Sequence, residues 1–130
     1  MGTYNILVIE DDEIVARTIE RSLRGLDFKV TAAASGVEGL RMARMNTPDL
    51  VILDVIMKTV LDGLHMSQEM ADDPDQRSTP ILMVTSIANS DYTALFPTDE
   101  YVHIDDFVSK PIAPDDLLRR VARLMKARAA

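Results

Sequence analysis

The stretch ILVIEDDE, residues 6–13, decides the fold because an apolar run of four residues ends abruptly in four carboxylates. Two further runs of the same kind follow, LVIL at 50–53 and ILMV at 81–84. A strand with one face in water is expected to alternate apolar and polar residues, whereas short, nearly pure apolar runs suit strands that are covered on both faces. The three runs therefore predict the central strands of a parallel sheet.

Segments with helical spacing separate these runs along the chain. Apolar residues recur at helical intervals over 14–23, and Pro114 suits the first turn of a last helix. Two weaker strand candidates, 28–33 and 104–108, complete the pattern. Five alternations of strand and helix with right-handed crossovers predict a doubly wound α/β sheet. The last helix carries five cations that we expect near its carbonyl end, namely Arg119, Arg120, Arg123, Lys126 and Arg128.

The length and composition of the chain exclude several classes of function. The chain has 130 residues and a net charge of −7, which predicts one free-standing domain, 1–130, whose surface repels nucleic acid and anionic membranes. The chain has no cysteine, which excludes a disulfide framework, a thiolate zinc site, an iron–sulfur cluster and a cysteine nucleophile. No apolar run exceeds four residues and no secretion signal opens the chain, so we expect a cytoplasmic protein.

Polar residues stand where the predicted strands end, namely Glu10, Asp11, Asp54, Thr85 and Lys110. The carboxyl ends of parallel strands share one edge of a sheet, where a ligand site is expected. Taken singly, the aspartates are ordinary helix caps or turn residues, but their coincidence at one edge favours a shared site. Carboxylates from separate strands suit Mg²⁺, which prefers oxygen ligands, and a lysine with a hydroxyl can hold phosphoryl oxygens.

Four motifs in this order resemble the receiver domain of bacterial two-component response regulators, the CheY-like family. They are ILVIEDDE, PDLVILD, PILMVTS and FVSKPI, and the resemblance covers nearly the whole chain. It implies a flavodoxin-like, five-stranded sheet in the order 2-1-3-4-5, flanked by five helices. It further implies a signalling phosphoacceptor rather than an enzyme, in which Asp54 takes a phosphoryl group from a sensor histidine kinase or a phosphotransfer protein.

The resemblance also implies a magnesium site. Glu10 and Asp11 align with the acidic pair of the family, with Asp11 as the direct ligand and Glu10 acting through water. Asp54 and the backbone carbonyl of Ile56 complete the protein ligands, and Asp12 is left as a helix cap.

A phosphate-responsive switch follows from the same resemblance. Thr85 is expected to bind the phosphoryl group and Lys110 to pair with it, while Pro111 is a candidate for a cis peptide bond. Phe107 stands where the family carries a switch aromatic, although a plain core residue explains it equally well. The moving surface would then bind a downstream output protein, and we expect a monomer or a weak dimer.

Two departures from the family pattern keep alternatives open. Lys58 replaces the usual proline, with Asp62-Gly63 one residue late, and the segment 87–106 is longer than usual. A degenerate receiver that binds partners without phosphate is one alternative. A magnesium-dependent phosphatase with an aspartate nucleophile is another, although the chain encodes no cap to enclose a substrate. The apolar Ile56 and Ile87 suggest slow self-dephosphorylation.

Overall fold

The computed structural model describes residues 4–23, 28–55, 68–76, 78–85, 106–109 and 112–129. Its strands are β1 (Tyr4–Ile9), β2 (Phe28–Ala33), β3 (Leu50–Val55), β4 (Ile81–Thr85) and β5 (Asp106–Ser109). Its helices are α1 (Glu13–Leu23), α2 (Gly36–Met45) and α5 (Pro114–Ala129), with a further helical segment at 68–72. None of the described helices has the length and apolar character needed to cross a bilayer.

The five strands form one parallel sheet in the order β2-β1-β3-β4-β5. This is the order that the family resemblance implies. β1 lies inside the sheet, where Ile6 is aligned with Val30 of β2 on one side and with Leu50 of β3 on the other. Of the five helices expected, α1, α2 and α5 are described, and the rest of that expectation falls partly or wholly outside the described residues.

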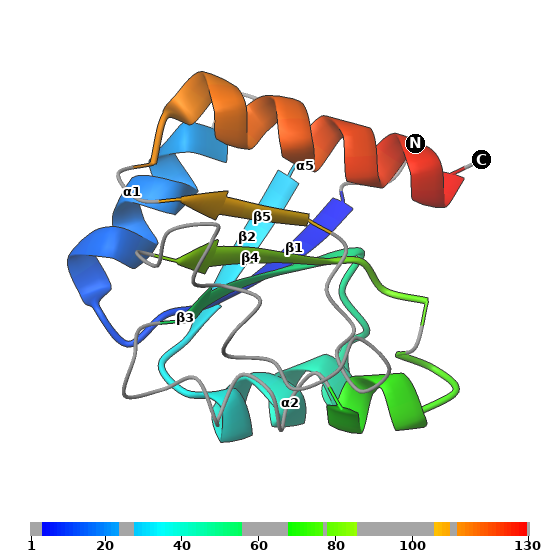
Figure 1. Cartoon of the computed structure of the whole chain (residues 1–130). Coiled ribbons are helices and arrows are strands. Elements are labelled where there is room, and N and C mark those ends of the chain that lie inside the picture. The colour runs from blue at the N-terminus through cyan, green and yellow to red at the C-terminus, as the bar shows by residue number, and fades with distance from the viewer. Residues whose placement is uncertain are drawn as a thin grey trace, which may run out of the picture.

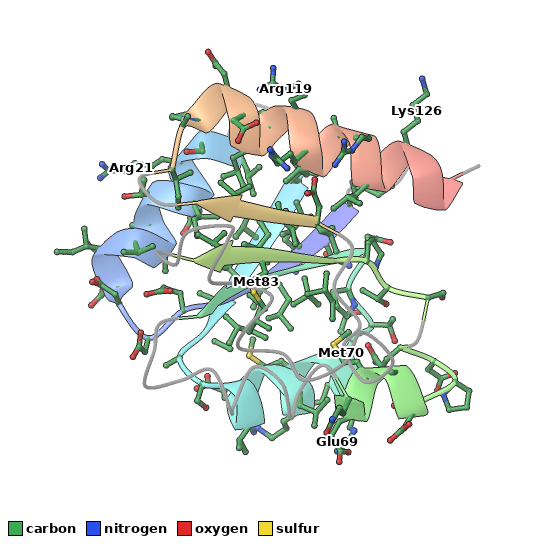
Figure 2. The ribbon with its side chains drawn as sticks, viewed as in Figure 1. Arg21, Glu69, Met70, Met83, Arg119 and Lys126 are labelled. Carbon is green, nitrogen blue, oxygen red and sulfur yellow. The ribbon has the colours of Figure 1, made fainter. Side chains whose placement is uncertain are left out.

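Helices cover both faces of the sheet. Figure 1 shows α1 and α5 on one side, and α2 with the helical segment 68–72 on the other. Neighbouring residues of each central strand divide between two clusters: Ile6 and Val8 of β1 pack with α1 and α5, and Leu7 and Ile9 pack with α2. Met70 and Met83 both point into the layer between the sheet and α2 (Figure 2).

The central strands are buried on both faces, which explains why their sequences lack alternation. Ile52 of β3 and Leu82 of β4 are fully buried on the α1 and α5 side, and Val51 and Ile81 are fully buried on the α2 side. Truncating one such side chain to alanine is expected to destabilise the fold by about 2–5 kcal/mol. The sheet is therefore a rigid support for the loops at its edges.

Side-chain caps fix the starts of the first two helices close to the strands that precede them. The Asp12 Oδ1 atom accepts hydrogen bonds from the backbone N–H of Ile14 at 2.9 Å and of Val15 at 3.4 Å. Ser35 caps α2, because its hydroxyl accepts a hydrogen bond from the N–H of Glu38 at 3.1 Å. Both caps lie just after the carboxyl end of a strand, so α1 and α2 begin at the same edge of the sheet.

Candidate functional site at the carboxyl edge of the sheet

The register of β1 and β3 brings two predicted acidic positions to the same edge. Ile9, the last residue of β1, is aligned with Leu53 of β3. Glu10 and Asp54 each follow this aligned pair, and neighbouring strands lie about 4.8 Å apart. The backbones of these two residues, 44 positions apart in the sequence, are therefore neighbours.

The register of β3, β4 and β5 extends this edge. Val55 is aligned with Thr85, the last residue of β4, and Thr85 is aligned with Ser109, the last residue of β5. Lys110 is the next residue in the sequence after Ser109. β3, β4 and β5 thus end level with one another, and β1 ends two residues earlier. The backbones of Glu10, Asp54 and Thr85, which the sequence singled out, therefore lie along one edge.

The acidic turn, residues 10–12, places its three carboxylates in different environments. Glu10 is 6% exposed, its N–H donates to the Ala33 carbonyl at 2.9 Å, and its Oε1 atom accepts from the N–H of Asp12 at 3.0 Å. Asp11 is exposed. Asp12 caps α1, which confirms its predicted role. The turn therefore holds Glu10 in place and leaves the carboxylate of Asp11 open to solvent.

Residues 6–122 match the family model of the response regulator receiver domain. The chain belongs to this family. The match includes every predicted site residue, from Glu10 to Pro111, and the receiver domain works in two-component systems.

Known proteins agree with this family and fold. The response regulator MprA of Mycobacterium sp. (strain KMS) is 34% identical over 128 residues, a match that covers 93% of this chain and 50% of that protein. The signal receiver domain of a signal transduction histidine kinase from Syntrophus aciditrophicus has a TM-score of 0.82 at 27% identity, over 95% of this chain and 91% of that one.

A second similar structure contains a metal ion. It is the receiver domain of the sensor histidine kinase PA1611 from Pseudomonas aeruginosa PAO1, with a magnesium ion coordinated in its active site cleft. Its TM-score is 0.78 at 26% identity, over 97% of this chain and 99% of that one. This receiver chain spans about half the length of the curated relatives it matches.

Several predicted site groups lie beyond what the structure describes. The backbone positions of Asp54, Thr85 and Phe107 are described, but their side chains are not. The following predictions fall outside the described residues: the Ile56 carbonyl, Lys58, Asp62-Gly63, Lys110, Pro111 and nearly all of the segment 87–106. Among the described side chains, no three carboxylates or imidazoles gather around one point where a metal could bind.

A second charged cluster, which the sequence did not predict, joins β5 to α5 of the receiver. Asp106 accepts a hydrogen bond from Arg120 Nη1 at 2.8 Å and forms an ion pair with Arg123. Asp116 accepts from Arg119 Nη2 at 2.9 Å and from Arg120 Nε at 3.1 Å. Only the helix dipole predicted the position of these arginines, because residues 14 positions apart, as Asp106 and Arg120 are, give no pairing signal in the sequence.

The cluster shifts the protonation of two groups. A hydrogen bond from Arg119, followed by the contacts with Arg120, holds the pKa of Asp116 below its usual value, while desolvation opposes this shift. For Arg120, desolvation lowers the pKa, but hydrogen bonds and charge attraction from Asp116 and Asp106 outweigh it, so its pKa lies above the usual value. Each charged form is therefore stabilised by its partners.

Proposed function

We propose that this receiver domain is a phosphoacceptor that takes a phosphoryl group onto Asp54 from a phosphohistidine of a sensor histidine kinase or a phosphotransfer protein. The observation that carries the proposal is the strand register, which sets the backbones of Glu10, Asp54 and Thr85 along one edge. If these residues were only helix caps and turn residues, their backbones would not need to lie along one edge. The match to the receiver-domain family supports phosphoryl transfer as the class of reaction.

The residues at this edge suit Mg²⁺. Glu10, Asp11, Asp54 and the Ile56 carbonyl offer only oxygen donors, which this hard cation prefers. The exposed carboxylate of Asp11 next to the fixed carboxylate of Glu10 fits such a role, and a magnesium ion occupies the active site cleft of the PA1611 receiver domain. When bound, the ion would neutralise negative charge on the phosphoryl oxygens.

The proposed transfer is an in-line displacement. A carboxylate oxygen of Asp54 attacks phosphorus, the bond from phosphorus to the histidine nitrogen breaks, and that nitrogen keeps the electron pair. The other ring nitrogen of the histidine carries a proton, so the products are an aspartyl phosphate and a neutral histidine. Lys110 pairs with the phosphoryl oxygens, so positioning and charge stabilisation supply most of the catalysis.

The product would change a surface of the receiver. An aspartyl phosphate adds about −1.5 to −2 charges and new acceptor oxygens. Thr85, at the end of β4, would donate its hydroxyl to this group, and Phe107 on β5 would follow into the vacated space. A downstream output protein then recognises the altered face. We expect self-dephosphorylation to be slow because Ile56 and Ile87 offer an attacking water no polar help.

Stoichiometric labelling tests the proposal. Incubation with acetyl phosphate and Mg²⁺ should add one phosphoryl group to each chain, detected by intact-mass spectrometry, and Asp54→Asn should remove the label. Asp12→Asn is the matched control, because asparagine keeps the cap on α1 in the same acidic turn. Unchanged labelling of Asp54→Asn would contradict the proposal, as would continuous hydrolysis of a general phosphatase substrate.

A further inference from the structure

The solvent side of α2 carries an apolar stripe with no partner among the described residues. Val37 is 77% exposed and Met45 is 78% exposed, with Arg41 midway between them on the same side of the helix. The other exposed large apolar side chains among the described residues are those of Tyr4 and Ile14, which lie on separate elements. Two of these four exposed apolar side chains thus lie on one short helix. Exposed apolar side chains that cluster in this way mark interaction surfaces.

A groove of about 500 Å³ accompanies the stripe and runs between α2 and the helical segment 68–72. Its apolar lining includes Val37, Leu40 and Met45, and its charged lining comes from Arg41, Arg44 and Glu69. The two helical elements lie on the same face of the sheet, and Glu69 points away from the sheet (Figure 2). We call this feature the α2 groove. Its volume falls within the range of about 300–1,000 Å³ that is usual for binding sites.

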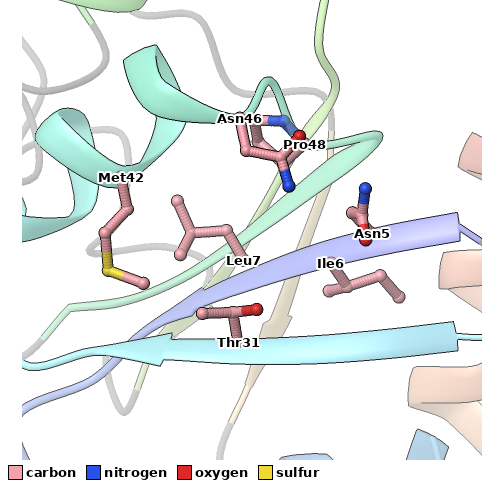
Figure 3. A pocket seen from close by; sticks show the side chains of 7 residues that line it. All are labelled: Asn5, Ile6, Leu7, Thr31, Met42, Asn46 and Pro48. Carbon is pink, nitrogen blue, oxygen red and sulfur yellow. The ribbon is translucent and has the colours of Figure 1, made fainter.

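Another hollow among the described residues is much smaller than the α2 groove. It lies between the first half of β1 and the end of α2, where Leu7 and Met42 face it together with Asn5, Thr31 and Asn46 (Figure 3). Its volume of about 80 Å³ lies well below the range of about 300–1,000 Å³ that is usual for binding sites. The α2 groove is therefore the better candidate for an interaction.

The charge of the α2 groove indicates the kind of partner. Arg44 pairs with Glu69 at 3.2 Å, so these two charges largely cancel. Arg41 forms no ion pair with any described residue and remains a free cation beside the apolar stripe. The helix dipole explains a cation in the last turn, such as Arg44, but not one a turn earlier. In a chain of net charge −7, a locally positive apolar groove favours an acidic partner.

We propose that the α2 groove docks an acidic amphipathic helix of a partner protein. Val37 and Met45 are eight residues apart, about 12 Å along the helix axis, which matches apolar side chains spaced over two turns of a partner helix. Those side chains would lie over Leu40, and a flanking carboxylate would pair with Arg41. This surface goes beyond the phosphoacceptor function, because none of the residues that line it is among the predicted site residues.

A designed peptide provides the test. The probe is a fluorescein-labelled helical peptide with leucines at i, i+4 and i+7 and glutamates on its flanks, and its counterpart carries lysine in place of each glutamate. Fluorescence anisotropy with the full chain should show that the lysine peptide binds at least about tenfold more weakly. Arg41→Glu should weaken the glutamate peptide by about tenfold, and Val37→Ser combined with Met45→Ser by at least as much.

Matched variants on α1 serve as controls. Ile14 is 76% exposed and Arg21 is also exposed, so Ile14→Ser with Arg21→Glu changes the same chemistry at a different surface. These controls should leave peptide binding unchanged, and all variants should keep their melting temperature and their labelling by acetyl phosphate. Retained labelling separates a failure of this inference from a failure of the phosphoacceptor proposal.

Three results would overturn the inference. The first is equal binding of the two peptides, or no binding of the glutamate peptide at about 1 mM. The second is an equal loss of binding in the α1 controls. The third is self-association in sedimentation velocity that disappears in the variant with Val37→Ser and Met45→Ser, because a second copy of the chain would then occupy the α2 groove.

Discussion

Two regions of the receiver concentrate charge, and they hold their carboxylates in different ways. In the acidic turn after β1, Glu10 and Asp12 accept hydrogen bonds from backbone amides. In the cluster between β5 and α5, Asp106 and Asp116 accept from arginine side chains. A backbone amide positions a carboxylate without cancelling its charge, whereas a guanidinium group cancels it. The difference suggests that the first region keeps its negative charge for a cation and the second stabilises the fold.

The largest expected effect concerns the acidic turn. Asp11→Asn, or removal of Mg²⁺ with a chelator, should slow labelling by acetyl phosphate about 100-fold or more, because charge on the phosphoryl oxygens would no longer be neutralised. Rates from quenched samples analysed by intact mass check this. Asp106→Asn is the control from the second region, and a comparable slowing in that variant would erase the distinction between the two regions.

The second effect concerns stability. Asp106→Ala should lower the free energy of unfolding by about 1–3 kcal/mol, because Arg120 and Arg123 lose a carboxylate whose side chain is only 13% exposed. Glu13→Ala removes an exposed ion pair with Arg17 and should change stability by less than about 0.5 kcal/mol. Urea unfolding followed by circular dichroism measures both. Equal effects would show that the β5 to α5 cluster has no special structural role.

A smaller effect is expected at the cap of α1. Asp12→Ala should destabilise the receiver by about 1 kcal/mol, whereas Asp12→Asn should be nearly neutral because asparagine caps as well as aspartate does. Thermal unfolding of the two variants provides the measurement. If Asp12→Asn instead abolished phosphoryl labelling, Asp12 would belong to the metal site and not to the helix cap.

The smallest effect is a dependence of stability on pH. The folded pKa of Asp116 lies below its unfolded value of 3.8, so its contribution is present above that value and is lost as the pH falls through the folded pKa. Asp116→Asn should therefore lower the stability above about pH 4, where this contribution is present, and flatten the decline at lower pH, so that the variant and the wild type converge in acid. Urea midpoints across this range test the sign, and a steeper decline in the variant would contradict it.

The central strands of the sheet could be predicted because each one is a continuous apolar run in the sequence. The runs at 6–9, 50–53 and 81–84 are apolar on both faces, and β1, β3 and β4 contain them. The capping role of Asp12 follows from its side-chain chemistry beside a helix start. Strand order came from the family resemblance, since periodicity alone does not determine which strands pair.

Features that depend on distant packing were beyond prediction. The pairing of Asp106 with Arg120 depends on how α5 lies against β5, and the α2 groove depends on the approach of 68–72 to α2. At the candidate site, the sequence and the strand register identify the edge of the sheet, whereas the roles of Asp54, Thr85 and Lys110 remain predictions from the family.

A crystal structure grown with Mn²⁺ in place of Mg²⁺ would test the proposed site most directly, because the anomalous signal of manganese locates the ion. We expect one strong peak bound by the carboxylates of Asp11 and Asp54 and by the Ile56 carbonyl, with the Lys110 ammonium group beside it. A peak elsewhere on the molecule, or side chains of Asp11 and Asp54 that point apart with no ion between them, would contradict the proposed phosphoacceptor site.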